Sequence, residues 1–351
     1  MEDLGTAPST DLFLALTPER VIDAVEAAGL RCDPACYPLN SFENRVYDVA
    51  LEGGGRVVAK FYRPGRWSEA QILEEHRFME DLDEAEVPVC RHRSFPDGTS
   101  LKRTEGIWYC LYDRYPGRAP QELDHETAER VGMMAARIHN VGAAGDAPHR
   151  HHLNGETYVG GNLDWMLDHG TIPAPFRDRY AAAADEIADG ADRLLEGVEI
   201  HRIHGDFHLG NLLVRDGIFN VLDFDDMVLG PAVQDLWLVL PGRDDHTRRL
   251  RESFLEGYEQ FRPFPRASLA LVEPLRGLRL IHYAAWLARR WHDPVFPSTW
   301  PHFGTEDYWS EETRELEDIV RMIRTDDPNA APSGPEEEVL TNKDYFFDWE
   351  G

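Results

Sequence analysis

Five aspartates and two histidines fall within residues 202–226, RIHGDFHLGNLLVRDGIFNVLDFDD, an otherwise apolar stretch. Asp206 stands five residues before Asn211, and in this D-x-x-x-x-N spacing a carboxylate accepts a substrate hydroxyl proton while the asparagine binds Mg²⁺. Asp223 follows in a DFD triplet, at the place of the metal-binding aspartate of kinases. The pattern predicts phosphoryl transfer, with Asp206 and Asp223 as catalytic residues and with Asn211 and Asp223 as ligands of Mg²⁺.

The chain between Asn211 and Asp223 predicts the element that brings these two residues together. Two apolar runs flank an Asp-Gly pair at residues 216–217, which is a strong signal for a β-hairpin. Folding at that turn places Leu222 opposite Asn211, so that Asp223 follows at the open end of the hairpin. Two oxygen ligands at one strand end suit Mg²⁺, whose coordination is typically completed by water and substrate phosphates.

The histidines of the same stretch allow a zinc site as an alternative. His204 and His208 are four residues apart, as in a helical zinc pair, and His201 lies just before them. Two glycines would interrupt any helix here, however, and no downstream glutamate or histidine completes a familiar ligand set. The favoured interpretation is that His204 braces the loop through hydrogen bonds to its backbone, and that the histidines at 149–152 belong to a solvated loop.

The elements that must position these residues begin with a sheet. Residues 17–29 predict a helix with a threonine cap followed by proline. Residues 44–64 alternate apolar side chains on both sides of three glycines, which predicts a hairpin whose second strand ends near Lys60. Residues 68–89 have apolar side chains at near-helical spacing, including Ile72, Leu73, Phe78 and Leu82.

The rest of the chain changes from sheet-like to helical composition. A further strand is predicted within residues 106–118 and breaks at Pro116, whereas residues 126–142 and 176–197 have helical patterns. An α+β, bilobal fold follows, with an antiparallel sheet and a helix in the N-lobe and a mostly helical C-lobe. The expected divisions are an N-lobe at 1–115 that binds nucleotide, a C-lobe at 116–327 with the catalytic loop and metal site, and a linker and aromatic tail at 328–351.

Composition narrows the class of protein. The 351 residues are 42% hydrophobic, enough for a large core and more than one lobe. A formal net charge of -28 opposes binding to nucleic acid. No apolar run approaches the roughly 20 residues of a membrane span, and the acidic N-terminus does not resemble a signal peptide, so we expect a cytoplasmic protein without a membrane partner. The four cysteines contain no CxxC pair, which gives no support to a disulfide framework.

These motifs together resemble a known group of phosphotransferases. The segments HGDFHLGN and VLDFDD are similar to the H-G-D-x-x-x-x-N loop and metal motif of the aminoglycoside phosphotransferase and choline kinase superfamily, whose fold is protein-kinase-like. The segments PLNSFENRVYDV, VAKFYRPGRW, ILEEH and GPAVQDLW resemble the bacterial stress response kinase A family, also called YihE or RdoA, over residues 10–325. The resemblance implies a monomeric, cytoplasmic Ser/Thr protein kinase that uses ATP and Mg²⁺ and acts in stress response and survival.

The same resemblance implies which residues bind the nucleotide. Lys60 ends a strand in VVAK, as does the lysine that pairs with the ATP phosphates in kinases, and it is one of three lysines although Lys and Arg together number 36. Glu75 is the preferred partner for Lys60, with Glu74 as the alternative. Ser41 replaces the glycines of a kinase phosphate loop and is implied to contact the ATP phosphates. The adenine is expected near residues 112–115, and Asp235 is expected to accept backbone N–H groups of the catalytic loop.

Two other function classes share these residues. A small-molecule phosphotransferase, acting on an amino alcohol, sugar or antibiotic, would use the same Asp206, Asn211 and Asp223. A nucleotide-binding module without catalysis is less favoured, because every expected reactive group is present. Resemblance around NSFENRVYDV favours the protein substrate.

Overall fold

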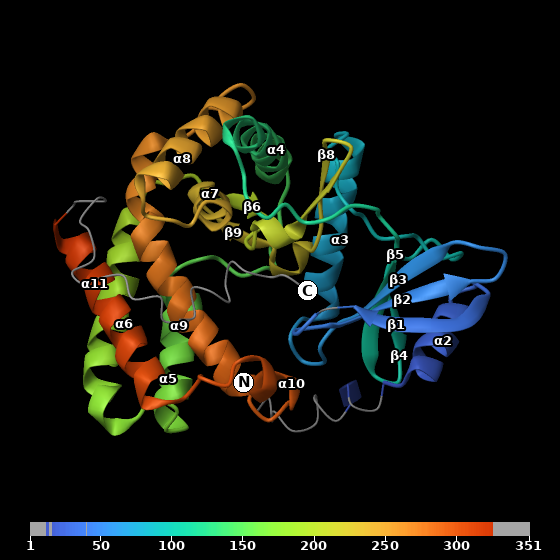
Figure 1. The fold of residues 1–351 in the computed structure, drawn as a ribbon, viewed down its shortest axis with the longest axis horizontal. Helices are drawn as coiled ribbons and strands as arrows, with labels where there is room; N and C mark the ends of the chain where they lie inside the picture. The colour runs from blue at the N-terminus through green and yellow to red at the C-terminus, as the bar shows by residue number, and fades with distance from the viewer. Residues whose placement is uncertain (1–11, 14–15, 40, 326–351) are drawn as a thin grey trace.

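The N-terminal lobe is built on a five-stranded antiparallel sheet (Figure 1). The computed structural model describes residues 12–13, 16–39 and 41–325. The strand order is β1-β2-β3-β5-β4. The strands are β1 Cys32–Leu39, β2 Arg45–Leu51, β3 Arg56–Phe61, β4 Lys102–Thr104 and β5 Ile107–Asp113, and helix α2, Pro18–Ala27, packs against β1.

The predicted hairpin around the three glycines forms the centre of this sheet. Strands β2 and β3 pair with Val46 opposite Lys60, and β3 pairs on its other side with Lys60 opposite Cys110. All three glycines of the turn, residues 53–55, have positive φ angles of 82°, 97° and 96°, a conformation that glycine adopts without steric cost. Lys60 is therefore held on the central strand, with paired strands on both sides.

Helix α3, Glu69–Glu84, links the sheet to the rest of the molecule. It begins with a capping box between Ser68 and Gln71. Ile72, near its start, packs in a small cluster under the sheet, whereas Phe78 and Leu82 belong to the core of the C-terminal lobe. The middle of α3 thus lies between the two lobes. Leu73, which belongs to the same apolar pattern, is 37% exposed.

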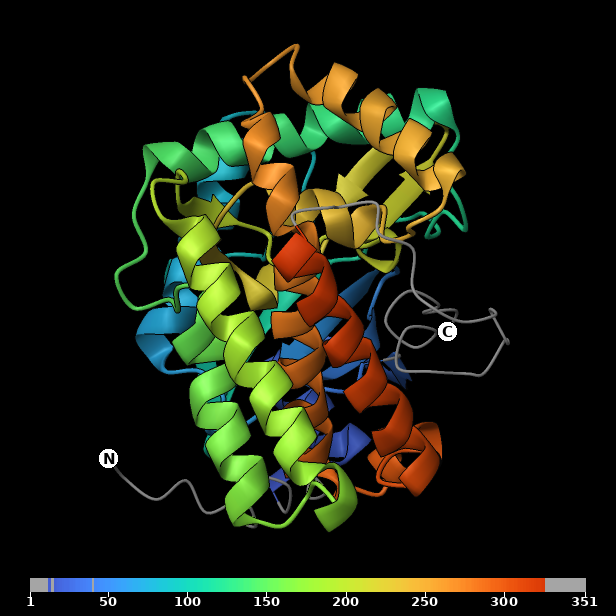
Figure 2. The same cartoon turned by 90° about the vertical axis from the view of Figure 1, so that its left-hand side faces the viewer.

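The C-terminal lobe is mainly helical and contains two groups of packed helices (Figures 1 and 2). Helices α4 and α8 cross in such close contact that a Cβ added to Gly132 of α4 would lie 1.9 Å from the carbonyl oxygen of Phe254. Helices α6, α9 and α11 pack side by side in the second group. The helices are α4 His125–Ala144, α5 Gly161–Asp168, α6 Ala174–Leu195, α7 Val233–Val239, α8 Asp245–Tyr258, α9 Val272–Arg290, α10 Val295–Thr299 and α11 Glu306–Thr325.

Two short strand pairs lie between these helices and the sheet. Strand β6, His201–Ile203, pairs with β9, Val228–Gly230, and β7, Leu212–Arg215, pairs with β8, Ile218–Val221. The β7–β8 turn has positive φ at both Asp216 and Gly217, the geometry that suits a two-residue hairpin. Beyond the last paired residues, the Leu222 N–H donates to the Asn211 carbonyl at 3.0 Å. The predicted hairpin and its register are confirmed.

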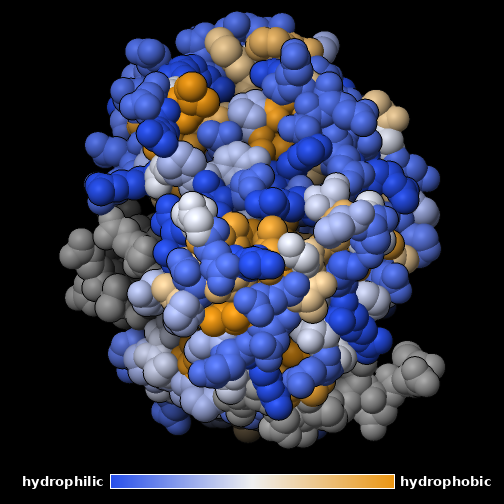
Figure 3. All heavy atoms as spheres, turned by 90° about the vertical axis from the view of Figure 1, so that its right-hand side faces the viewer, coloured by the Kyte–Doolittle hydropathy of each residue, from blue (hydrophilic) through white to orange (hydrophobic). Residues whose placement is uncertain are grey.

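The fold class predicted from the sequence is confirmed: the protein is α+β, with an antiparallel sheet in one lobe and a mostly helical second lobe. The face shown in Figure 3 is largely hydrophilic, with small hydrophobic groups scattered over it. In the part of the chain that the structure describes, no helix is long and apolar enough to cross a membrane. The expected linker and aromatic tail lie outside the described residues.

Candidate active site

The catalytic loop predicted from D-x-x-x-x-N follows strand β6 and ends in a short 3₁₀ turn, η2, Leu209–Asn211. The Asn211 side-chain amide donates to the Asp206 carbonyl at 2.8 Å and lies 3.4 Å from an Asp206 carboxylate oxygen. Gly205 has φ +82°, and a Cβ there would lie 2.3 Å from the Asp226 carbonyl oxygen, so only glycine fits without displacing that backbone. The loop thereby packs directly against the segment that carries the second predicted metal ligand.

A buried carboxylate braces this loop. Asp235, at the start of α7, accepts the backbone N–H of His204 at 3.0 Å and of Gly205 at 2.9 Å. It also contacts the buried His139 ring at 3.0 Å. His204 contacts the Leu222 carbonyl through Nε2 at 2.9 Å and accepts the Asp206 N–H at Nδ1. The bracing roles predicted for Asp235 and His204 are confirmed.

Asp223 lies at the open end of the hairpin in an uncommon backbone conformation. Its φ and ψ are 60° and 65°, the left-handed region, which costs an L-residue free energy and is enriched at functional sites. The following 3₁₀ turn, η3, Phe224–Asp226, buries Phe224 against His204 and α3. The Asp223 side chain remains 46% exposed, whereas Asp225 next to it is buried.

Lys60 lies at the centre of a cluster of carboxylates that come from residues 223–225 and from helix α3. Its ammonium is 2.9 Å from Asp223, 3.3 Å from Asp225 and 3.5 Å from Glu75 of α3. Glu74 points elsewhere and accepts the backbone N–H groups of His149 and Arg150. Of the two glutamates that the sequence left open, Glu75 is therefore the one beside Lys60.

Burial and charge shift the acid–base properties of this cluster. Burial by itself would lower the pKa of Lys60, but Asp223, Asp225 and Glu75 outweigh it and hold that pKa well above its usual value. Burial raises the pKa of the Glu75 carboxyl to about 7, against the opposing charge of Lys60 and with a contribution from Asp225. Lys60 is therefore a fixed cation, while Glu75 titrates near neutral pH.

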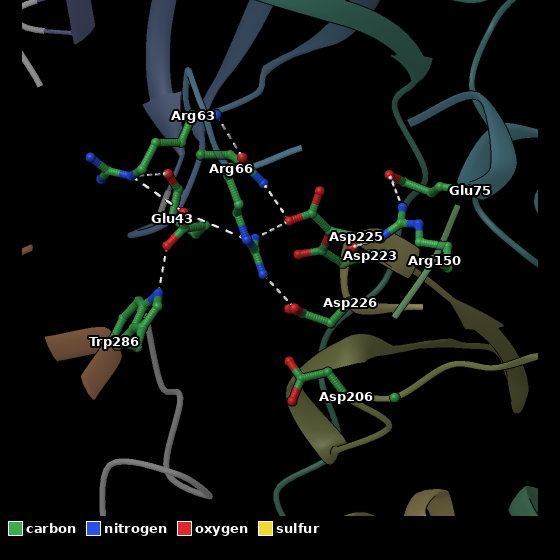
Figure 4. A network of polar contacts seen from close by, with 12 residues as sticks. Glu43, Arg63, Arg66, Glu75, Arg150, Asp206, Asp223, Asp225, Asp226 and Trp286 are labelled. Carbon is green, nitrogen blue, oxygen red and sulfur yellow. Dashed lines mark hydrogen bonds and ion pairs between the residues drawn. The ribbon is translucent and has the colours of Figure 1, made fainter. Parts of the chain in front are cut away.

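Two arginines complete the cluster, and sequence reasoning missed both. Arg66, after β3, forms ion pairs with Asp225 and Asp226 (Figure 4). Arg150 donates to the Asp225 carbonyl at 2.7 Å and lies 3.3 Å from Glu75. Arg150 is 3% exposed, whereas His149, His151 and His152 beside it are exposed, as expected of a solvated loop. Arg66 lies within the quoted segment VAKFYRPGRW, which could have indicated it, whereas the HRHH context gave no such signal for Arg150.

The loop between β1 and β2 carries Ser41 and is tied to the C-terminal lobe. Glu43 of this loop accepts from the indole N–H of Trp286 on α9 (Figure 4). It also pairs with Arg290 of the same helix at 2.6 Å. Asn44 donates to the Asp225 carboxylate at 3.1 Å. Ser41 is half-buried in the same loop, and among the described residues no hydrogen bond joins it to the Lys60 cluster. The loop that carries Ser41 is thus joined to the cluster through Asn44.

Asp206 has a cationic neighbour that the sequence did not predict. The Arg279 guanidinium of α9 pairs with one carboxylate oxygen of Asp206, and His208 lies 3.4 Å from the other. Burial would raise the pKa of Asp206, but the charge of Arg279 holds it well below its usual range. A carboxylate that stays ionised and 20% exposed can accept a proton from a bound hydroxyl group.

The histidines named in the zinc alternative do not converge. The His201 ring packs against His139, and His208 accepts the Gly210 N–H at Nδ1. Among the described residues no group of three or more His, Cys, Asp or Glu side chains is arranged to hold a metal ion. The Mg²⁺ site predicted from one asparagine, one carboxylate and substrate phosphates does not require such a group of three side chains.

The geometry is that of a kinase-like phosphotransferase, and comparison with known proteins agrees. The model of the phosphotransferase enzyme family matches residues 36–272. Stress response kinase A of Escherichia coli K12 is 40% identical over 313 residues, covering 89% of this chain and 95% of that protein. The serine/threonine protein kinase RdoA of Salmonella typhimurium LT2 is 38% identical over 312 residues, covering 89% and 94%. The chain belongs to the stress response kinase A family, within the phosphotransferase enzyme family.

Solved structures show the same fold. An amicoumacin kinase in complex with AMP-PNP, Ca²⁺ and amicoumacin superposes with a TM-score of 0.70 at 19% identity, covering 91% of this chain and 96% of that one. A microcompartment-associated aminopropanol kinase gives a TM-score of 0.65 at 18% identity, covering 89% and 99%. Family and fold together establish an ATP-dependent kinase that transfers phosphate to a hydroxyl group.

Proposed function

We propose that this kinase phosphorylates Ser and Thr hydroxyl groups of proteins, in stress response and survival. The observation that carries the proposal is the convergence of Asp206, Asn211 and the Lys60 cluster. The chain that holds them is 40% identical to stress response kinase A and 38% identical to the serine/threonine protein kinase RdoA. Lys60 and Glu75 come from the sheet lobe, whereas Asp206, Asn211 and Asp223 come from the other lobe. The reaction would take place where the two lobes meet.

The proposed roles follow from the positions of the side chains. Asp206 accepts the proton of the acceptor hydroxyl while the hydroxyl oxygen bonds to the γ-phosphorus of ATP. The bond between that phosphorus and the β–γ bridging oxygen breaks, which releases ADP. Lys60, oriented by Glu75, pairs with the α and β phosphates. Ser41 and its loop cover the phosphates, and the adenine lies near residues 112–115.

The residues present fit Mg²⁺. The Asn211 amide nitrogen is used by the Asp206 carbonyl, so its carboxamide oxygen is directed away from that bond and can serve a metal ion. The Asp223 carboxylate is 46% exposed, which leaves oxygen accessible beside Lys60. When bound, Mg²⁺ would neutralise phosphate charge and orient the γ-phosphate. With Mg²⁺ bound, the partly exposed carboxylates of Asp223 and Asp226 would be stabilised by this ion as well as by Lys60 and Arg66.

The remaining parts of the proposal concern the molecule as a whole. We propose a monomeric, cytoplasmic enzyme without nucleic-acid or membrane partners. Its nucleotide-binding lobe is taken as residues 1–115, its catalytic lobe as 116–327 and its tail as 328–351. The proposed boundary falls just after β5, where the sheet ends.

The direct test is phosphate transfer from labelled ATP, with Mg²⁺, Mn²⁺ or Ca²⁺, to mixed proteins and to a panel of small alcohols. Labelled phosphoserine or phosphothreonine in the protein arm is the expected result. A small-molecule phosphotransferase is the second candidate, because the structural relatives named above are kinases of amicoumacin and aminopropanol. Transfer confined to small alcohols would support this candidate and contradict the first.

A further inference from the structure

One face of helix α9 extends from the proposed base toward a second basic residue. Arg279, His282 and Arg289 share this face, because their spacing of three and seven residues returns to the same side of a helix. Arg279 pairs with Asp206, so one end of the face lies at the reaction centre. The Asp206 and Arg279 side chains are both 20% exposed, which leaves room for contact with an acceptor.

His282 connects the two arginines. Its ring stacks on Tyr158 with centroids 4.8 Å apart, and its Nδ1 accepts from the Asn162 amide at 3.1 Å. Burial, followed by the charges of Arg279 and three other arginines, lowers the pKa of His282 to about 3. His282 is therefore neutral, and the positive charge of this face comes from Arg279 and Arg289.

Arg289 differs from the other arginines at this site in what it contacts. Arg66, Arg279 and Arg290 each pair with carboxylates. Arg289 donates to the Asn162 side-chain oxygen and to the Gly161 carbonyl, and it stacks over Trp165 at 5.0 Å. Among the described residues no carboxylate lies within ion-pair distance of Arg289. The Arg289 side chain is therefore half-buried, and the groups that contact its guanidinium are neutral.

The charge balance near Asp206 also changes during the proposed reaction. Before transfer, the Asp206 carboxylate balances Arg279. Once Asp206 has accepted the hydroxyl proton, its negative charge beside Arg279 is lost, although Asp226 still contributes there. A negative group on the acceptor would restore the balance near Arg279 and provide a counter-charge for Arg289.

We propose that this face of α9 binds acidic side chains next to the phosphorylated residue, so that the enzyme prefers Ser or Thr in acidic protein segments. This inference rests on the proposed protein-kinase function. Arg279 and Arg289 are ten residues apart on α9, about 15 Å along the helix axis, and an extended chain advances about 3.3 Å per residue. The favoured acidic residue should therefore lie within about four residues of the acceptor.

The test uses the full-length protein with Mg²⁺ and ATP. Matched peptides contain one serine and carry Glu, Gln or Lys at each position within about four residues of it. We expect Glu to exceed Gln in kcat/KM about fivefold or more at one or two positions, and Lys to fall below Gln, as for a partly exposed ion pair. Arg289→Gln should bring the Glu/Gln ratio toward one, Arg289→Lys should retain it, and Arg289→Glu should favour Lys.

Arg179→Gln is the matched control, because this exposed arginine of α6 pairs with Glu317 on the surface. It should leave kcat/KM and the ratio unchanged. A wild-type preference for Gln or Lys, or an unchanged ratio in Arg289→Gln, would overturn the inference. If an Arg289 variant does not fold, the order of kcat/KM for the Glu, Gln and Lys peptides with the wild-type enzyme still tests whether acidic segments are preferred. If mixed proteins are phosphorylated without acidic preference, the inference alone fails; if small alcohols are phosphorylated and proteins are not, the proposed function fails with it.

Discussion

At the scale of single residues, the proposed base Asp206 can be separated from the residues that bind nucleotide. Asp206→Asn keeps the size of the side chain but removes the proton acceptor, so kcat should fall by about 10² to 10⁴, the usual range for general acid–base catalysis. Nucleotide affinity should change little, because Lys60 and Asp223 are untouched. Rapid-quench kinetics and calorimetric ATP titration measure the two quantities.

Asp216→Asn serves as the control, because Asp216 is an exposed turn residue on the same hairpin and asparagine tolerates its positive φ. Transfer at more than a tenth of the wild-type rate in Asp206→Asn would remove this residue from the role of base.

Glu75 should make folding stability depend on pH. Its folded-state pKa of about 7 lies above its ordinary value of 4.5, so the folded protein holds a proton that the unfolded chain releases. The stability from this proton is present at low pH and is lost as pH rises through 7. Between pH 6 and 8 the loss is about 1 kcal/mol.

Urea unfolding of the nucleotide-free protein measures this effect, and Glu75→Gln should abolish that part of the pH dependence. Glu84→Gln, on the exposed end of the same helix, should keep it. Identical pH profiles for the wild type and Glu75→Gln would show that Glu75 is already ionised below pH 6.

The residues that sequence reasoning found and missed differ in how far apart their partners lie. Asp206 and Asn211 are five residues apart, and a local motif with known chemistry describes them. Arg66 and Asp225 are 159 residues apart, and Arg150 and Glu75 are 75 apart. Such pairs form only when separate elements pack. Their ion pairs follow from the tertiary structure, and no spacing in the chain encodes them.

At the scale of elements, helix α7 supports the catalytic loop through one carboxylate. Asp235→Ala would leave the buried N–H groups of His204 and Gly205 without an acceptor, and each such loss costs about 1–3 kcal/mol. We therefore expect the free energy of unfolding to fall by at least about 2 kcal/mol. Hydrogen exchange at residues 203–211 should accelerate more than exchange in the sheet.

Asp245→Ala, in the exposed first turn of α8, is the control for this experiment. It should alter stability slightly and leave exchange in the loop unchanged. Normal exchange protection of the loop in Asp235→Ala would mean that its other contacts are sufficient to hold it.

Elements with strong local signals were predictable. The Asp-Gly turn, the three-glycine turn and the threonine cap each specify a backbone geometry within a few residues. The positions of α5 and of the α9 face toward Asp206 were not predicted, because they depend on which helices pack together. The exposure of Leu73 has the same origin. Helix α3 packs against both lobes, so which of its residues are buried depends on the contacts of both.

At the scale of the whole molecule, nucleotide and metal should stabilise both lobes together. Lys60 belongs to one lobe and Asp223 to the other, so a ligand that contacts both binds the folded state alone. At a concentration 100 times the Kd, such a ligand adds about 2.7 kcal/mol of stability. Thermal melts should shift upward with Mg²⁺ and ATP together in the wild type, whereas Asp223→Asn should lose most of this shift.

ATP with EDTA is the control for the metal, and Asp206→Asn is the control for general damage near the site. A wild-type shift in Asp223→Asn would contradict its assignment as a metal ligand. An equal shift without divalent metal would contradict the role of Mg²⁺.

The scarcity of lysine makes the nucleotide site accessible to covalent labelling. An amine-reactive ester has three side chains to acylate in this chain, and Lys343 lies outside the described residues. Lys102 is 27% exposed, whereas Lys60 is 6% exposed and held by three carboxylates. A general reagent should therefore modify Lys102 before Lys60, while an acyl phosphate of ATP should deliver its acyl group to Lys60. Because this chain has so few lysines, tryptic digestion would give few acylated peptides. The amount of the Lys60 peptide would report occupancy of the nucleotide site directly, even in a mixture of proteins.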